Sequence, residues 1–214
     1  QEEVEQVVRE AKANGILLDL IHIDNWQEIP NQGLWIWDKK RFPNPQAMIR
    51  FLHERNVRLS LWIFPYVSER SPYFEHFAAK KYFVMSTSDQ GPARFKATAD
   101  AKDLVACFDF TNPEVRTWYS EKVKEIIGLG VDVIKNDFSE AVPEDVLFFD
   151  GSSGVQSHNR LPYLYAKTIY DAMADACHGT GRVPMLWSRS GYAGQQTIPA
   201  VWAGDSGVLA ADHA

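Results

Sequence analysis

Charged and aromatic side chains stand at the ends of several apolar segments in this 214-residue sequence. These residues are Asp24, Trp62, Lys135, Asp137, Arg189 and Asp205. In α/β barrels the carboxyl ends of the strands form the rim that carries the active site, so the pattern predicts a site built from several strands. A single aspartate at a strand end is more often the N-cap of a helix, but five segments ending in this way favour a site.

Lys135 and Asp137 are two residues apart, so on a strand both side chains project from the same face. An ammonium beside a carboxylate favours the ionised acid, which a nucleophilic carboxylate requires. A structural salt bridge is the alternative interpretation of this pair. An aldolase that uses Lys135 as a Schiff base is disfavoured, because a neighbouring carboxylate stabilises the charged ammonium rather than the free amine.

The elements that must position these residues alternate between apolar segments and amphipathic helices. The expected strands are residues 16–24, 57–64, 131–137, 183–188 and 200–204. The expected helices cover 2–14, 45–56, 159–177 and a stretch from Asn112-Pro113 to Gly128 and Gly130. Nearly continuous apolar strands are typical of parallel sheets buried on both faces. This order predicts an α/β fold, either a (β/α)₈ barrel or an open doubly wound sheet.

A long irregular excursion separates the second predicted strand from the third helix. It covers about residues 65–106 and includes a short helix near 72–80. Insertions of this length in a compact pattern are usually functional. No glycine-rich phosphate loop of either common type follows a predicted strand, which argues against a nucleotide-binding sheet.

Composition narrows the class of protein further. The net charge is −6, which argues against a nucleic-acid partner, because phosphate binding needs clustered Lys and Arg. No apolar run approaches the roughly 18–20 residues that cross a bilayer, so no membrane span is expected. The two cysteines have no metal-ligand spacing, and no metal site is predicted. The sequence begins with Gln1 rather than Met, which suggests a cut chain and leaves localisation open.

Residues 133–140, Val-Ile-Lys-Asn-Asp-Phe-Ser-Glu, resemble the nucleophile motif of glycoside hydrolase family 31. The α-xylosidase branch of that family carries the form Lys-Thr-Asp-Phe-Gly-Glu. Further matching segments extend the resemblance over roughly residues 15–206. They are Phe42-Pro43, Trp62 to Tyr66, Asp109 to Pro113, Phe149 to Gly151, His158-Asn159, Ser188 to Gly191 and Trp202 to Ser206.

The resemblance implies a role for each matching position. Asp137 would be the nucleophile and Asp205 the general acid/base. The implied substrate-binding residues are Asp24, Trp26, Trp62, Lys135, Arg189 and Trp202, with Lys135 beside the nucleophile and Trp26 crowding the exocyclic carbon of the sugar. The sequence departs from the branch at Asn25, Asn136, Ser139 and Ala203, which leaves the carboxylates in place and the substrate open.

Two other polar residues of these segments receive less specific predictions. His22 falls on the same strand face as Asp24 and is expected to be a hydrogen-bonded residue of the barrel interior, although it could also reach sugar hydroxyls. Glu140 lies three residues beyond Asp137 and is expected to be a supporting loop residue rather than a third catalytic acid.

The activity implied by the resemblance is that of a retaining α-glycosidase, whose two carboxyl groups lie about 5–5.5 Å apart and need no metal or organic cofactor. An α-xyloside is the first choice of substrate, with α-glucosides and α-galactosides left open. A complete (β/α)₈ barrel takes about 250 residues. Residues 1–214 are therefore expected to be one partial barrel domain with about five of eight strands. The missing strands and flanking β domains would belong to a longer parent chain. The alternative is a catalytically incomplete fragment that at most binds carbohydrate.

Overall fold

A parallel sheet organises the computed structural model, which describes residues 1–205. Five strands form it in the order β1-β2-β6-β8-β9, and all neighbours run parallel. Their bounds are Leu20–Ile23, Arg58–Ile63, Val133–Asn136, Met185–Ser188 and Ala200–Val201. The order follows the sequence, so each strand lies beside the next parallel strand, as in the wall of a barrel. The predicted α/β class and the number of parallel strands are confirmed.

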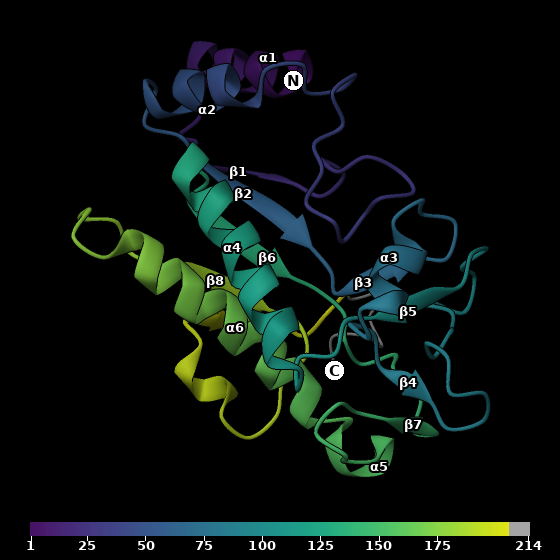
Figure 1. Cartoon of the computed structure of the whole chain (residues 1–214). Coiled ribbons are helices and arrows are strands. Elements are labelled where there is room, and N and C mark those ends of the chain that lie inside the picture. The colour runs from purple at the N-terminus through teal and green to yellow at the C-terminus, as the bar shows by residue number, and fades with distance from the viewer. Residues whose placement is uncertain (206–214) are drawn as a thin grey trace, which may run out of the picture.

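Helices α4 and α6 cover one face of this sheet (Figure 1). The helices are α1 Glu2–Ala13, α2 Pro45–His53, α3 Phe74–Ala79, α4 Pro113–Leu129, α5 Gly154–Ser157 and α6 Arg160–Cys177, with a 3₁₀ turn η1 at Gln195–Thr197. The two longest, α4 and α6, lie side by side across the strands. Asn112 caps α4 by accepting a hydrogen bond from the Glu114 amide, and Pro113 occupies the first helical position. Local chemistry therefore starts α4 where the sequence predicts it.

The side chains of β2 point alternately into the hydrophobic core and to the opposite face of the sheet. Leu59, Leu61 and Ile63 are buried within the hydrophobic core. Ser60 and Trp62 project from the opposite face, because successive side chains alternate across a strand. Their polar atoms contact side chains of β1 and the segment after β6. One strand thus contributes both to the core and to the concave side of the sheet.

The excursion after β2 forms short strands that the sequence did not predict. Its β3 (Tyr66–Ser68) pairs antiparallel with β5 (Val105–Cys107), and its β4 (Met85–Ser86) pairs antiparallel with β7 (Val146–Leu147), which follows β6. An aromatic cluster anchors the excursion to α4. Its members are Phe77, Phe83, Phe108 and Trp118. The segment is therefore packed against the barrel wall rather than irregular throughout.

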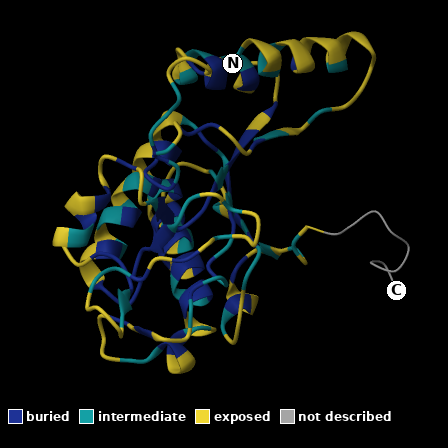
Figure 2. Cartoon of the chain, turned by 90° about the vertical axis from the view of Figure 1, so that its right-hand side faces the viewer, coloured by how far each residue is buried: buried dark blue, intermediate teal, exposed yellow. Residues whose placement is uncertain are grey.

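The first predicted strand, 16–24, is shorter and more exposed than expected. The strand β1 covers only Leu20–Ile23, and Ile16 and Leu17 are 61% and 95% exposed. Within residues 1–205, β1 pairs with β2 alone, so its other edge has no strand beside it. Figure 2 shows α1 set apart from the main body, with Val8 as its one buried residue. The prediction of a strand buried on both faces is therefore wrong for β1.

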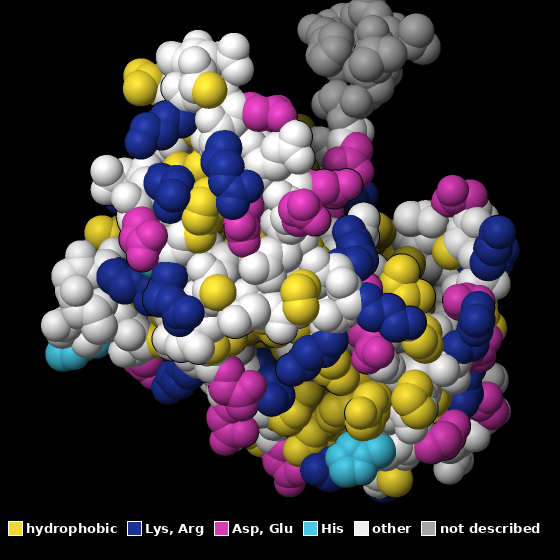
Figure 3. Space-filling model, turned by 90° about the horizontal axis from the view of Figure 1, so that it is seen from above, with side chains coloured by type: hydrophobic (Ala, Val, Ile, Leu, Met, Phe, Trp, Pro, Cys, Tyr) yellow, Lys and Arg dark blue, Asp and Glu magenta, His cyan; other side chains and the backbone are white. Residues whose placement is uncertain are grey.

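Residues 1–205 contain neither a membrane-spanning helix nor a cluster of metal-binding side chains. Across residues 1–205, none of the helices has the length and apolar character that spanning a membrane requires. In the same range, no group of three or more His, Cys, Asp or Glu side chains is placed to hold a metal ion. Figure 3 shows acidic and basic side chains interspersed on the upper face of the molecule.

The turn from α4 into β6 requires glycine at position 130. Gly130 has φ 112°, and a Cβ there would lie 2.8 Å from Ile49 Cγ2 on α2. We expect Gly130→Ala to destabilise the protein by about 2 kcal/mol through backbone strain and overpacking. Gly128→Ala is the control, because a Cβ at this helical position meets nothing within 4 Å and should stabilise by about 0.5–1 kcal/mol.

Urea unfolding of both variants in the full-length protein, followed by tryptophan fluorescence, measures this contrast. The midpoint should fall for Gly130→Ala and rise slightly for Gly128→Ala. Equal midpoints for the two variants would show that the α4–β6 turn tolerates a side chain and that α2 does not press on it.

Candidate active site

The carboxylate of Asp137 lies at the carboxyl end of the central strand and is almost completely buried. Its backbone amide donates to the Ile63 carbonyl, which continues the β2–β6 pairing by one residue. Three donors surround the side chain. Trp62 Nε1 lies 2.7 Å from Oδ2, while the Phe138 amide and Arg189 Nη1 lie 2.9 Å and 3.2 Å from Oδ1. These three donors fix the orientation of the buried carboxylate.

Arg189 joins the two carboxylates that the sequence proposed as catalytic. It follows β8 directly, and its backbone amide donates to the Asn136 carbonyl. The same Nη1 atom that contacts Asp137 lies 3.9 Å from Asp205 Oδ2. These two carboxylate oxygens are therefore no farther apart than the sum of the two distances. That limit accommodates the separation of about 5–5.5 Å that a retaining glycosidase uses.

The two acids differ in their surroundings. Asp137 is enclosed by Trp62, Phe138 and Arg189, whereas the Asp205 side chain is 85% exposed and lies at the end of the described residues. A nucleophile benefits from fixed donors, and a proton donor benefits from access to water and to a leaving group. The arrangement therefore suits two carboxylates with different tasks.

Within residues 1–205, Lys135 forms its ion pair with Asp24 and not with Asp137, the strand neighbour with which the sequence paired it. Its Nζ atom is 3.6 Å from Asp24 Oδ1 and lies 5.3 Å and 5.0 Å from the ring centroids of Trp187 and Trp202. Aromatic faces attract an ammonium group, and both rings lie close to this one. Among residues 1–205, the cation in contact with Asp137 is Arg189.

Asp24 is held at the carboxyl end of β1 by a short chain of polar side chains. Its Oδ1 accepts a hydrogen bond from His22 Nε2 at 2.7 Å, and His22 Nδ1 lies 2.8 Å from Ser60 Oγ. Burial is the main cause that lowers the pKa of His22, so the ring is neutral at neutral pH. A neutral ring that donates from Nε2 accepts at Nδ1, which fits the hydroxyl of Ser60. The expected interior position of His22 agrees with these contacts.

Trp26 has a different role from the one that the resemblance implied. Its side chain has no exposed surface, and its Nε1 donates to the Trp62 carbonyl at 2.7 Å. The ring packs against Trp35 and Trp37, with centroid distances of 6.4 Å and 4.7 Å. A sugar cannot touch a ring enclosed in this way, so the predicted contact with the exocyclic carbon is wrong. Trp26 instead fixes the strand end that carries Trp62.

Trp62 and Trp202 are both partly exposed near the two carboxylates. Trp62 stacks on Phe64 with ring centroids 4.7 Å apart, and Trp202 packs against Trp187 at 5.1 Å. Half-exposed aromatic rings beside carboxylates are the kind of surface on which sugar rings pack. The structure thus leaves both tryptophans available for the subsite that the sequence assigned to them.

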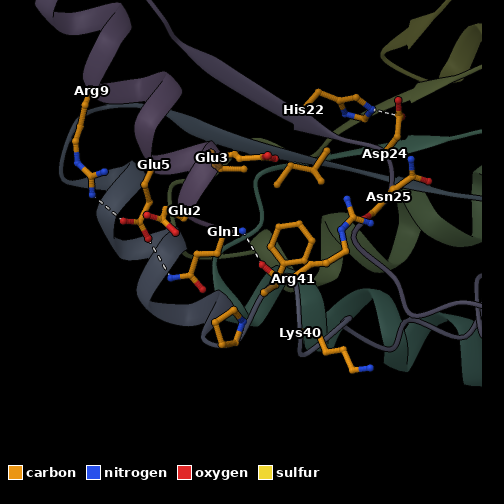
Figure 4. Close-up of a pocket in the computed structure, with 14 residues that line it drawn as sticks. Gln1, Glu2, Glu3, Glu5, Arg9, His22, Asp24, Asn25, Lys40 and Arg41 are labelled. Atoms are coloured by element: carbon orange, nitrogen blue, oxygen red, sulfur yellow. Dashed lines mark hydrogen bonds and ion pairs between the residues drawn. The ribbon is translucent and has the colours of Figure 1, made fainter.

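A hollow of about 880 Å³ lies on the other side of β1, between that strand and α1 (Figure 4). His22, Asp24 and Asn25 border it on one side, and Glu2, Glu3 and Glu5 of α1 line the opposite wall. The hollow touches the Asp24 carboxylate but does not include Asp137, Arg189 or Asp205. We therefore locate the candidate active site at the carboxyl ends of β2, β6, β8 and β9 rather than in this hollow.

Sequence reasoning missed the hydroxyl that shapes the turn after Asp137. Phe138 and Ser139 have φ of 61° and 87°, in the left-handed region that favours glycine. The Tyr66 hydroxyl accepts hydrogen bonds from the amides of Ser139 and Ala141 at 2.9 Å and 3.3 Å. Burial raises the pKa of Tyr66, so this hydroxyl stays neutral. Ser139 occupies the glycine position of the resembled motif, which was the available signal for an unusual turn.

Comparison with known proteins identifies the family. A family model described as the glycosyl hydrolases family 31 TIM-barrel domain matches residues 1–213. The chain belongs to glycoside hydrolase family 31. The resemblance inferred from the motifs is therefore confirmed, and the five-stranded sheet is part of the TIM barrel of this family.

Several family 31 proteins are similar to this chain. It is 35% identical over 161 residues to the alpha-xylosidase XylQ of Lactiplantibacillus pentosus, covering 74% of this chain and 20% of XylQ. It is 32% identical over 200 residues to an alpha-xylosidase of Emericella nidulans, covering 91% of this chain and 24% of that protein. The chain thus spans about a fifth to a quarter of these curated relatives.

Solved structures of the family share the same fold. A family 31 alpha-xylosidase from a soil metagenome, complexed with xylose, superposes with a TM-score of 0.82 at 27% identity. The match covers 97% of this chain and 30% of that one. A family 31 sulfoquinovosidase from E. rectale has a TM-score of 0.82 at 24% identity, over 95% of this chain and 31% of that chain, and shows the fold alone.

The indole donor of Trp62 offers a direct test of the family 31 site. We expect Trp62→Phe to lower kcat by about 10²-fold, because the ring packing is kept while one fixed donor to a buried carboxylate is lost. Steady-state kinetics of the full-length protein on an aryl α-glycoside measure the change. Trp118→Phe, a partly buried tryptophan on the outer helix α4, is the control and should leave kcat within about twofold.

Proposed function

We propose that the full-length protein is a retaining α-glycoside hydrolase that removes a terminal α-linked sugar, with Asp137 as nucleophile and Asp205 as general acid/base. The observation that carries the proposal is the shared contact of both carboxylates with Arg189 Nη1, at 3.2 Å and 3.9 Å. Membership of family 31 supports it, because retention is general to that family.

In the first step a protonated Asp205 donates its proton to the glycosidic oxygen while the bond from that oxygen to the anomeric carbon breaks. An Oδ atom of Asp137 attacks the anomeric carbon from the opposite side and forms a β-linked glycosyl ester. Asp137 loses its negative charge when the ester forms, and the aglycone leaves as a neutral alcohol. Trp62 and the Phe138 amide keep the attacking carboxylate oriented toward its target.

In the second step Asp205, now ionised, removes a proton from water. The resulting hydroxide oxygen attacks the anomeric carbon, and the bond to Asp137 breaks. This second inversion restores the α configuration, returns the negative charge to Asp137 and leaves Asp205 protonated for the next cycle. The high exposure of Asp205 supports this role, because water and the departing alcohol reach it without rearrangement.

The remaining side chains of the rim are proposed to hold the sugar. Asp24 and Arg189 present charged groups that can bind hydroxyls, and Trp62 and Trp202 provide ring faces for the sugar. Lys135 adds positive charge between Asp24 and Trp202, so it is proposed to orient Asp24 rather than Asp137. No step of this mechanism uses a metal or an organic cofactor.

An α-xyloside is the proposed substrate. The lysine at position 135 matches the α-xylosidase form of the motif, and two relatives are named alpha-xylosidases. The buried ring of Trp26 adds no support for this choice, and α-glucosides and α-galactosides remain alternatives. Another relative, from Bacillus thermoamyloliquefaciens, is named alpha-glucosidase 2 and is 27% identical over 217 residues.

A panel of 4-nitrophenyl α-glycosides tests the proposal on the full-length protein. The α-xyloside should give the highest kcat/KM, and proton NMR should detect the α anomer as the first product. A first product with the β configuration would contradict retention. A higher kcat/KM for the α-glucoside or α-galactoside would correct the substrate and leave the mechanism in place. The matching β-xyloside serves as the control and should not be hydrolysed.

The second candidate is that residues 1–214 alone form an incomplete barrel that at most binds carbohydrate. The open edge of β1 favours it, because within residues 1–205 this strand pairs only with β2 and leaves apolar side chains exposed. We expect the isolated segment to hydrolyse aryl α-glycosides far more slowly than the full-length protein. Equal rates would show that the segment contains every group that catalysis needs.

A further inference from the structure

Glu140 lies in the turn after Asp137, and its side chain contacts the Arg189 nitrogen that does not face Asp137. Its Oε1 lies 2.9 Å from Arg189 Nη2, and its Oε2 accepts a hydrogen bond from the Ser190 hydroxyl. Both carboxylate oxygens are thus engaged with the segment that follows β8. The side chain is 38% exposed, so the pair lies at the margin of the site rather than deep within it.

The path of the turn explains why this carboxylate points inward. Phe138 and Ser139 adopt left-handed conformations, and the Tyr66 hydroxyl holds the amides of Ser139 and Ala141. Such a conformation persists where the surroundings impose it. The turn therefore directs Glu140 toward Arg189.

Arg189 is fixed on three sides by this arrangement. Nη2 faces Glu140, Nη1 faces Asp137 and Asp205, and the ring of Phe138 lies 4.8 Å from Cζ. A planar guanidinium held in this way has one orientation, which is the geometry that makes arginine effective at paired carboxylates. An isolated surface ion pair contributes little, but this pair sets the position of an atom shared by two acids.

We propose that Glu140 is a positioning residue of this active site, which holds Arg189 between Asp137 and Asp205. The inference rests on the proposed function. It also accounts for both oxygens of Glu140 being used by consecutive residues, Arg189 and Ser190.

Two substitutions in the full-length protein separate position from charge. Glu140→Gln keeps an oxygen that can accept from Arg189 and removes the charge. Glu140→Ala removes both. Glu144→Gln is the matched control, because this carboxylate is exposed on the same loop. Thermal unfolding midpoints of all three variants, compared with the unaltered protein, verify that each one folds.

We expect Glu140→Ala to lower kcat by about 10²-fold, the cost of a misplaced catalytic group. Glu140→Gln should keep kcat within about fivefold, because its side-chain oxygen can still accept a hydrogen bond from Arg189 and hold the guanidinium in place. Glu144→Gln should leave kcat unchanged.

A loss of kcat in Glu140→Gln as large as that in Glu140→Ala would overturn the proposal, because the conservative variant should restore the position of Arg189. Normal kcat in both variants would overturn it as well. If the unaltered protein is inactive on every α-glycoside, the proposed function itself fails and this inference fails with it. Activity of the unaltered protein, with equal kcat losses in the two Glu140 variants or with none in either, refutes only the role of Glu140.

Discussion

Replacing Asp137 with alanine should reduce kcat on 4-nitrophenyl α-glycosides by at least about 10⁴-fold, because the proposed nucleophile that forms the glycosyl ester is lost. The cavity left beside Trp62 Nε1 and Arg189 Nη1 would hold a small anion, since both donors point at the missing carboxylate. Added azide should therefore restore part of the turnover. The product should be a β-glycosyl azide, formed by a single inversion.

Two further variants make the Asp137 experiment specific. Asp137→Asn keeps the shape of the side chain and should be as inactive as the alanine variant, which separates loss of charge from loss of packing. Asp145→Ala removes an exposed carboxylate from the same loop and should retain full activity. Normal turnover by Asp137→Ala, or an α-glycosyl azide as its product, would show that the nucleophile lies elsewhere.

Replacing Asp205 with alanine should produce a loss that depends on the leaving group. Disaccharides and alkyl glycosides need a proton on the departing oxygen, so their kcat/KM should fall by about 10²–10⁴-fold. The loss should be many times smaller for 4-nitrophenyl glycosides, because nitrophenolate leaves without a proton. The alkaline limb of the pH profile should also disappear for the activated substrates.

Azide distinguishes the two acids. In Asp205→Ala the first step still proceeds with an activated glycoside. The glycosyl ester then accumulates until it is attacked by a nucleophile that needs no general base. Azide should therefore raise kcat and give an α-glycosyl azide, the product of two inversions. Equal losses on activated and unactivated substrates, or a β-glycosyl azide, would remove Asp205 from the acid/base role.

The helices of the barrel wall were predictable because their signals are local. Asn112 and Pro113 start α4 through one side-chain hydrogen bond and one fixed dihedral angle, and the helix ends at a glycine with positive φ. The length of β1 was not predictable in the same way. An apolar run at 16–24 indicates residues that avoid water, but pairing requires a neighbouring strand, and only Leu20–Ile23 has one.

Alternation and strand ends predicted much of the candidate site. Asp137 and Arg189 come directly after parallel neighbours β6 and β8, so their side chains emerge at the same edge of the sheet. The sequence could not decide which cation faces the nucleophile. The Lys135 side chain has four rotatable bonds, and its ammonium group lies near the rings of Trp187 on β8 and Trp202 after β9. Both rings belong to other parts of the chain.

The sequence by itself determined the class of fold, the family and the positions of the strand-end acids, because these depend on residue type and on short-range periodicity. Only the tertiary structure decided that Trp26 is enclosed by Trp35 and Trp37, and that Glu140 turns back to Arg189. Both outcomes depend on contacts between distant parts of the chain. The Tyr66 hydroxyl, 73 residues from Ser139, stabilises the turn that places Glu140 beside Arg189. No local sequence pattern predicts a contact between residues so far apart in the chain.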